Sequence, residues 1–187
     1  MQKMSQTIIE VANTHGGSYE YMISLINEFE SIQPSGMKFQ PFKYDRIAVK
    51  KYKGYELYKK LFFNRNQWKE IIKIANETKE VWLDVFDAYG IDIFAANIDS
   101  IYGLKLQTSV LDNITVLEAL KGLELNDKKI ILNIAGRKKS DIQYYISYFQ
   151  ENYNFNEILL EIGFQSYPTQ LLDSGISKIE DTKKILD

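Results

Sequence analysis

Residues 129–165, KIILNIAGRKKSDIQYYISYFQENYNFNEILLEIGFQ, carry the clearest fold signal in the chain. An apolar run, Lys129–Ala135, opens this stretch, and a second apolar run, Ile158–Gln165, closes it. Between them, residues 140–153 have a helical pattern that begins with Ser-x-x-Gln, a common helix start. Two nearly continuous apolar strands joined by a helix predict parallel strands that are buried on both faces.

The same alternation extends toward the N-terminus and to the end of the chain. Further strands are expected at Thr7–Asn13, Met37–Phe42, Val81–Asp87 and Gly103–Thr108. Helices are expected after Ser18, over Asn64–Lys79, around Ile91–Ile98, over Asn113–Leu125 and from Ser177 onward. This order indicates an α/β fold in one domain, residues 1–187. It leaves two architectures open, an open doubly wound sheet and a (β/α) barrel.

Composition excludes several classes of function. The 187 residues have a formal net charge of −2, so no overall excess of positive charge favours nucleic acid or a membrane as partner. No cysteine is present, which excludes thiolate metal sites and cysteine nucleophiles. The single histidine, His15, excludes a metal site with two imidazoles from these residues. With no signal-peptide pattern at its start, the chain is expected to be cytoplasmic.

A short repeat marks the expected ligand site. Gly36–Gln40 (GMKFQ) and Gly103–Gln107 (GLKLQ) are nearly identical strand ends, and Gly-x-Gln recurs at 163–165. Side chains alternate along a strand, so Lys38 and Gln40 share one face, as do Lys105 and Gln107. A lysine on the inner face of a buried strand is costly unless it meets a negative charge.

Two partners for these lysines are open. Ligands of α/β proteins bind at the carboxyl ends of strands, so the two lysines could converge on a carboxylate or phosphate ligand. Alternatively, they pair with acidic residues near the strand ends. These acids are Glu10, Asp84, Asp87 and Glu161.

The turn after the first expected strand contains a second group of polar residues. Asn13, His15 and Gly16 belong to this turn, and together with the following helix start they could cradle an anion. His15 could equally be a structural turn residue. Glu10 could be a general base or a salt-bridge partner of an inner lysine.

Two basic segments have alternative interpretations as well. Tyr44–Phe63 combines aromatic residues with lysines and could stack on single-stranded nucleic acid, but a packed insertion at the barrel rim is favoured. Arg137, with two following lysines, could add positive potential at the ligand face, but a solvated loop is favoured.

Taken in order, these motifs resemble the N-acetylneuraminate (sialic acid) synthase family. The residues 10–17, EVANTHGG, resemble its opening Glu-Ile-Gly-x-Asn-His-x-Gly motif, and Lys38–Gln40 is similar to its Lys-Phe-Gln. Phe86–Asp87 resembles its Pro-Phe-Asp, and residues 167–169 match its Tyr-Pro-Thr. The resemblance covers nearly the whole chain.

The resemblance implies an aldolase-type TIM (β/α)₈ barrel, of which about six βα units are present as an incomplete or open barrel. It implies a transferase that condenses phosphoenolpyruvate with an N-acyl mannosamine-type sugar to a nonulosonic acid, in sialic acid or other carbohydrate biosynthesis. Glu10 would lie near the reacting centre. The substrate-binding residues would be Lys38, Gln40, Lys105, Gln107, Thr108, Asn133, Gln165 and Tyr167.

Several family features have no counterpart in these residues. The family's divalent metal, manganese or magnesium, is held by histidines of strands seven and eight, which with the C-terminal antifreeze-like domain would fall beyond Asp187. Val110 replaces an acid that contacts the sugar in the family. We therefore expect little condensation activity from this chain alone and a possible homodimer through open sheet edges. The alternative function is a non-catalytic anion-binding or interaction module derived from the barrel.

Overall fold

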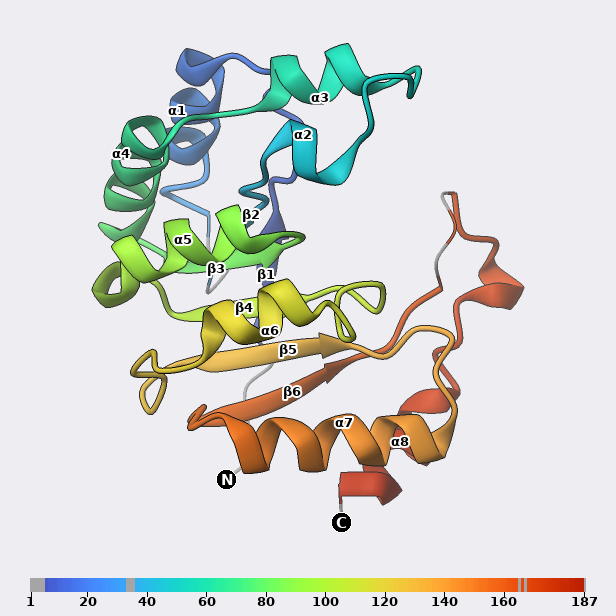
Figure 1. The fold of residues 1–187 in the computed structure, drawn as a ribbon. Helices are drawn as coiled ribbons and strands as arrows, with labels where there is room; N and C mark the ends of the chain where they lie inside the picture. Colours follow the sequence, from blue (N-terminus) through green and yellow to red (C-terminus); the bar gives the residue numbers. More distant parts are fainter. Residues whose placement is uncertain (1–5, 33–35, 165, 167, 187) are drawn as a thin grey trace. The chain divides into compact units, whose positions relative to one another are not determined.

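The computed structural model describes residues 6–32, 36–164, 166 and 168–186. The chain forms two compact units, residues 1–104 and residues 105–187. The boundary lies inside one strand, β4 (Gly103–Leu106). Within each unit, strands alternate with helices, as the sequence predicts (Figure 1).

The first unit contains parallel strands that neighbour one another in chain order. They are β1 (Ile8–Glu10), β2 (Gly36–Phe39) and β3 (Glu80–Val85), followed by the start of β4. The register places Glu10 opposite Lys38, and Lys38 opposite Trp82. A doubly wound sheet reverses its strand order at a switch point, whereas a (β/α) barrel adds each strand beside the previous one. The order observed here is that of the barrel.

The helices of the first unit follow their capping signals. They are α1 (Tyr19–Glu28), α2 (Tyr44–Ile47), α3 (Tyr55–Leu61), α4 (Arg65–Asn76), α5 (Ala88–Ala96) and the 3₁₀ turn η1 (Ile98–Ser100). Ser18 accepts a hydrogen bond from the Tyr21 N–H at 3.2 Å, and Asn64 forms a complete capping box with Gln67. Both predicted helix starts are confirmed.

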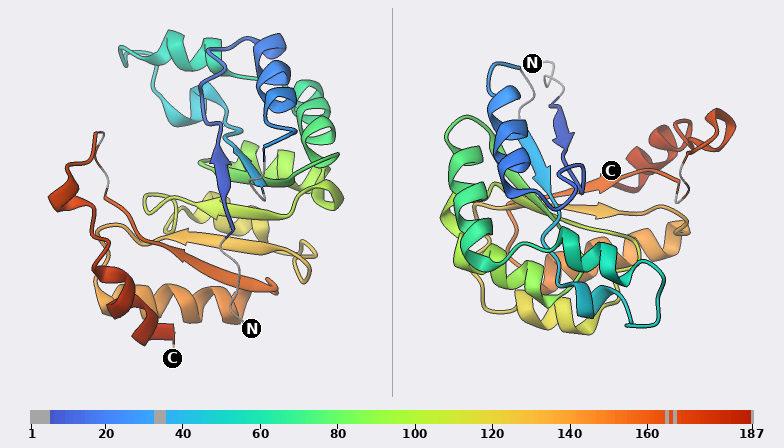
Figure 2. Two further views of the ribbon diagram at one scale, coloured as in Figure 1. Left: turned by 180° about the vertical axis from the view of Figure 1, so that it is seen from behind. Right: turned by 90° about the horizontal axis from the view of Figure 1, so that it is seen from above.

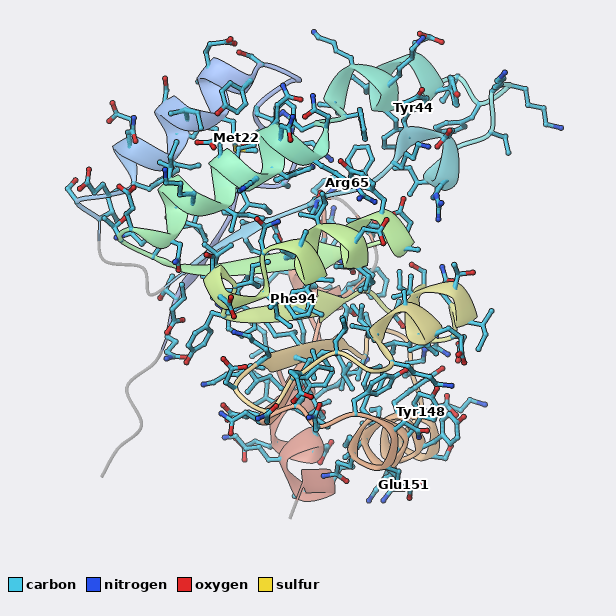
Figure 3. All side chains as sticks on the ribbon, turned by 60° about the vertical axis from the view of Figure 1, so that its left-hand side comes forward. Met22, Tyr44, Arg65, Phe94, Tyr148 and Glu151 are labelled. Carbon is cyan, nitrogen blue, oxygen red and sulfur yellow. The ribbon has the colours of Figure 1, made fainter. Side chains whose placement is uncertain are left out.

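Strand alternation divides the side chains of the first unit between two faces. Met37, Phe39, Val81 and Leu83 are fully buried on the face that the helices cover. Helices α1 and α4 lie side by side over this face, and Met22 of α1, labelled in Figure 3, is also fully buried (Figures 2 and 3). Each such side chain contributes about 1.5–3 kcal/mol by leaving water, so this layer fixes the strand register. Glu10, Lys38 and Trp82 therefore lie on the opposite, inner face.

The second unit continues the pattern with two paired strands. They are β5 (Lys129–Asn133) and β6 (Glu157–Glu161), with α6 (Ile114–Leu120), α7 (Lys139–Asn152), the 3₁₀ turn η2 (Leu171–Asp173) and α8 (Lys178–Leu186). The two strands are parallel, and Asn133 lies opposite Glu161. Helix α7 packs against α8. Residues 157–161 are all half-buried, so β6 is the less covered of the two strands.

Several element boundaries differ from the sequence prediction for local reasons. Helix α5 begins earlier than residue 91, because Asp87 caps it by accepting the Gly90 N–H at 3.0 Å. Helix α6 ends at Leu120 rather than Leu125, just before Gly122 takes a positive φ of 78°. Helix α7 begins before Ser140, and the predicted Ser-x-x-Gln start is wrong. Instead, the Lys138 N–H donates to Asp141 at 3.2 Å.

The strands are shorter than predicted, since β2 ends at Phe39 and β6 ends at Glu161. The segment Tyr44–Phe63, expected to be a packed insertion, contains the two short helices α2 and α3. Its rings pack on one another, with the ring centroid of Tyr44 5.6 Å from those of Tyr55 and Phe62. Among the described residues, no helix has the length and hydrophobicity required to cross a membrane.

The turn between β1 and α1 depends on one glycine in particular. Gly17 has a φ of +85°, and a Cβ at this position would collide with the backbone carbonyl oxygen of Lys60. Gly16 has a φ of +59°, but a Cβ there would meet nothing within 4 Å. Substitutions at Gly16 and Gly17 can therefore distinguish the cost of a left-handed backbone from the cost of a steric clash.

We expect Gly17→Ala to lower the free energy of unfolding by about 3 kcal/mol, since it adds a steric clash to the left-handed backbone penalty. Gly16→Ala is the matched control and is expected to cost about 1 kcal/mol, the backbone penalty alone. Urea unfolding followed by circular dichroism measures both. Equal losses in the two variants would contradict the close packing of this turn on Lys60.

Candidate functional site

A buried lysine and a carboxylate face each other at the inner face of the first unit. Lys38 Nζ lies 2.7 Å from Glu10 Oε2. The Lys38 side chain is 9% exposed, whereas that of Glu10 is 42% exposed. The ammonium group therefore lies beneath its partner, and the carboxylate is the more accessible of the two.

Three further polar side chains extend this group, which we call the first network. The Gln40 amide donates to Asp84 Oδ2 at 3.4 Å and accepts from Asn13 Nδ2 at 3.3 Å. Asp84 is fully buried. The first network thus comprises Glu10, Lys38 and the chain Asn13–Gln40–Asp84 at the carboxyl ends of β1, β2 and β3.

His15 has a structural position in the turn that follows β1. Its ring is 3% exposed, packs on Phe63 with 4.5 Å between centroids, and accepts the Gly17 N–H through Nδ1 at 3.0 Å. Burial lowers the pKa of His15 to about 4, so the ring is neutral at physiological pH. A neutral ring that accepts a backbone N–H serves the turn, and its imidazole adds no positive charge to an anion cradle.

The backbone of the same turn is strained at one position. Ala12 has a φ of +44°, a conformation that side chains other than glycine rarely adopt. This strain lies two residues after Glu10, where the chain leaves β1. Strained residues persist only where the surrounding structure holds them, and they cluster at binding sites.

The second unit contains an equivalent arrangement, the second network. Lys105 Nζ lies 3.0 and 2.8 Å from the two carboxylate oxygens of Glu161. Asn133 donates to Glu161 at 2.8 Å and to Gln107 at 3.2 Å. The Lys105 side chain is 6% exposed and that of Glu161 35%, so again the carboxylate is the outer partner.

Thr108 and Arg137 lie next to the second network. Thr108 Oγ1 donates to the Ala135 carbonyl at 3.1 Å and accepts from Arg137 Nε at 3.0 Å. Arg137 is a half-buried residue with several hydrogen bonds, and not a solvated loop residue as the sequence favoured. Its position directly after a predicted strand end is the one sequence feature that indicates a place near the ligand face. The sequence gives no indication of its hydrogen-bond partners.

The structure therefore shows internal pairing of both lysines, with Glu10 and with Glu161. Asp87 pairs with neither, because its carboxylate accepts the Lys43 and Gly90 N–H groups. Burial raises the pKa of Asp87, and these backbone bonds oppose the rise. Two predicted substrate residues, Gln165 and Tyr167, lie outside the described residues.

The described residues do not fit a resident metal ion. No group of three or more His, Asp or Glu side chains within this part of the chain is placed to hold one. Glu10 and Glu161 are instead engaged with lysines, and Asp84 accepts a hydrogen bond from Gln40. The divalent metal implied by the sequence resemblance thus has no ligand set here, and no chemical step is assigned to it.

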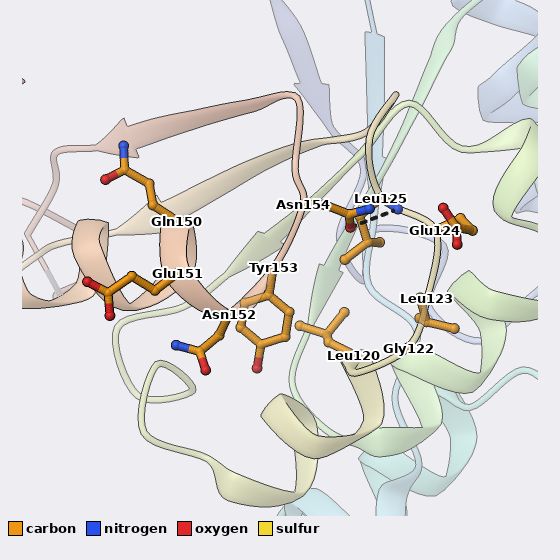
Figure 4. Close-up of a pocket in the computed structure, with 10 residues that line it drawn as sticks. All are labelled: Leu120, Gly122, Leu123, Glu124, Leu125, Gln150, Glu151, Asn152, Tyr153 and Asn154. Atoms are coloured by element: carbon orange, nitrogen blue, oxygen red, sulfur yellow. Dashed lines mark hydrogen bonds between the residues drawn. The ribbon is translucent and has the colours of Figure 1, made fainter.

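One cavity of about 520 Å³ lies in the second unit, at the end of the strands opposite to the network (Figure 4). The segments that lead into β5 and β6 line it, with Asn154 accepting the Leu125 N–H at 3.3 Å. In (β/α) folds this end of the sheet serves stability, and ligands bind at the other.

These features define the class of the protein, an α/β fold of the (β/α)-barrel type with charged networks at the carboxyl ends of its strands. No family model and no curated protein matches the sequence. Solved structures do match. The chain is similar to a protein assigned as spore coat polysaccharide biosynthesis protein E of Chromobacterium violaceum, with a TM-score of 0.82 at 18% identity. The match covers 97% of this chain and 55% of that one.

Two further structures are similar. The N-acetylneuraminic acid (sialic acid) synthetase of Leptospira borgpetersenii, solved with citrate, has a TM-score of 0.81 at 20% identity, covering 98% of this chain and 65% of that one. The spore coat polysaccharide biosynthesis protein spsE of Bacillus subtilis has a TM-score of 0.78 at 19% identity, covering 98% and 51%. The chain thus spans about half to two thirds of their length. The likeness confirms the sequence resemblance at the level of the fold.

We expect the single His15 ring to titrate at a pH of about 4, since folding favours its neutral form. Because this pKa is below the unfolded value of about 6.5, the contribution of His15 to stability is fully present above pH 6.5 and is lost as the pH falls toward 4. Imidazole proton–carbon NMR spectra over this range measure the titration directly, as no other histidine is present. A midpoint near 6.5 would contradict the buried, neutral ring.

Proposed function

We propose that this chain provides the phosphoenolpyruvate-binding part of a sugar-acid synthase. In that reaction the enol carbon of phosphoenolpyruvate bonds to the aldehyde carbon of an N-acyl mannosamine-type sugar. Water then adds to the adjacent carbon, and phosphate leaves from it. The product is a nonulosonic acid.

The observation that carries the proposal is the buried lysine at the same position of two strands, each closed by an outer glutamate. For protein stability alone, a buried lysine under an accessible carboxylate has no advantage. Replacing such an ion pair with hydrophobic residues of similar volume often leaves the free energy of unfolding unchanged. An anion-binding lysine needs this arrangement, because a ligand can replace the outer carboxylate while the ammonium stays in place.

The proposal makes each lysine an anion-binding group for phosphoenolpyruvate, as the sequence resemblance implies. Glu10 is 42% exposed and Glu161 35% exposed, so either carboxylate can return to water when it is displaced. A displaced Glu10 would then be available near the reacting centre to accept a proton. Gln40 and Gln107 follow the two lysines on the same face, and they add amide donors for substrate oxygens.

The comparisons support the carbohydrate side of the proposal. One similar structure is a sialic acid synthetase, and two are spore coat polysaccharide biosynthesis proteins. These proteins have 18–20% sequence identity to this chain. The particular reaction and sugar therefore rest on the sequence motifs and the two networks.

A second candidate function is anion binding without turnover. It is favoured by the lack of a metal-ligand group among the described residues and by the closed state of both lysine–glutamate pairs. Under this candidate the chain binds phosphoenolpyruvate and releases no phosphate. A phosphate-release assay with manganese or magnesium and several N-acyl mannosamine-type sugars separates the two functions.

We expect Lys38→Ala and Lys105→Ala each to weaken phosphoenolpyruvate binding at least tenfold, because each removes a charge-assisted contact with the ligand. Isothermal titration calorimetry measures the affinity. The matched control is Lys129→Ala, since Lys129 forms a similar pair with Glu157 at 2.8 Å but lies at the amino end of β5. Unchanged affinity in both lysine variants, or an equal loss in Lys129→Ala, would contradict the proposed site.

A further inference from the structure

The guanidinium group of Arg137 is held in a fixed orientation beside the second network. Its Nε donates to Thr108 Oγ1 at 3.0 Å, and its Nη2 donates to the Thr108 carbonyl at 2.6 Å and to Asp112 Oδ2 at 3.1 Å. The group also lies 5.0 Å from the centre of the Tyr145 ring. Three hydrogen bonds and one ring contact leave this side chain little rotational freedom.

The carboxylate of Asp112 is divided between two donors. The Tyr145 hydroxyl donates to Asp112 Oδ1 at 2.6 Å, while Arg137 contacts the other oxygen. The hydrogen bond from Tyr145, followed by the contacts of Arg137, keeps the pKa of Asp112 below its usual range. Asp112 is thus ionised at neutral pH. It contacts the guanidinium group of Arg137 through Nη2 only.

The other end of the guanidinium group is available for a ligand. Arginine has five N–H donors in a planar fork. Nε and Nη2 use three of them, and within the described part of the chain the two N–H groups of Nη1 have no hydrogen-bond partner. The Arg137 side chain is 25% exposed, so a solvent-borne ligand can reach it.

A purely structural role would be to tie the segment after β4 to the segment after β5. Thr108 already makes that connection through its bond to the Ala135 carbonyl at 3.1 Å. Asp112 is likewise already bound to α7 through Tyr145. The guanidinium group therefore adds a fixed positive charge at a place where two other bonds already join the segments.

We infer that Arg137 binds the phosphate group of the substrate through Nη1, at the carboxyl end of the second unit. This inference rests on the proposed function, which supplies a phosphate-bearing substrate. Phosphate suits this position because the two N–H groups of Nη1 can donate to its oxygens, and because the guanidinium charge beside them is fixed. Arg137 is thereby a specificity residue, since it favours a phosphorylated enol acid over the corresponding keto acid.

The test compares Arg137→Gln with Arg65→Gln in calorimetric titrations with phosphoenolpyruvate, inorganic phosphate and pyruvate. Arg65 is the matched control, because it pairs with Asp92 at 2.9 Å on the helix layer of the first unit (Figure 3). We expect Arg137→Gln to weaken binding of phosphoenolpyruvate and phosphate about tenfold and to leave pyruvate binding unchanged. Arg137→Lys, which keeps the charge but loses the fork, is expected to recover part of the loss.

Native affinity for phosphate in Arg137→Gln overturns the inference. An equal loss for phosphate and pyruvate also overturns it, since a loosened loop would affect both ligands alike. The proposed function is judged separately by Lys105→Ala. If that variant loses phosphoenolpyruvate while Arg137→Gln does not, the function stands and the role of Arg137 is wrong. If the native chain binds neither phosphate compound, both are wrong.

Discussion

A buried ammonium group that requires a negative partner is the constraint on which both networks depend. Lys38 and Lys105 are each less than a tenth exposed, and isolated charges are not stable at such positions. In the first unit the partner comes from the strand register, which places Glu10 directly opposite Lys38. In the second unit it comes from the end of β6, where Glu161 reaches Lys105 with both carboxylate oxygens. In the first unit, the helix layer fixes this register by burying the opposite face of β2 and β3.

The same constraint makes the pairs exchangeable. An anion beside each lysine offsets the desolvation penalty of its ammonium group. Any anion in that position serves, so a doubly charged ligand group can replace a glutamate. Under the proposed function, the accessible carboxylates are the parts that move, while burial keeps the lysines in place. An unliganded protein of this kind keeps its site closed by its own acids. Under the proposed function, internal pairing and anion binding, which the sequence presents as alternatives, are two states of each lysine.

The order of strands and helices was predictable from the sequence because it rests on local signals. Apolar runs marked each strand, and Asn64 with Gln67 formed the capping box that their spacing indicates. Boundaries were less predictable where a single residue intervened. Asp87 was expected to end a strand but caps α5, and Gly122 stops the short helix before it.

The candidate site was predictable in its residue types but not in its contacts. Strand alternation placed Lys38, Gln40, Lys105 and Gln107 on inner faces. It could not select among four acids, since that choice depends on strand register. The contacts of Arg137 were not predicted, because they join it to residues 25 and 29 positions away. No local pattern encodes such contacts.

A crystal structure of the chain with phosphoenolpyruvate tests the central claim most directly. The account predicts a ligand oxygen within hydrogen-bond distance of Lys38 Nζ or Lys105 Nζ, with the glutamate of that pair, Glu10 or Glu161, displaced from the lysine. A bound ligand elsewhere, with both lysine–glutamate pairs intact, would contradict it.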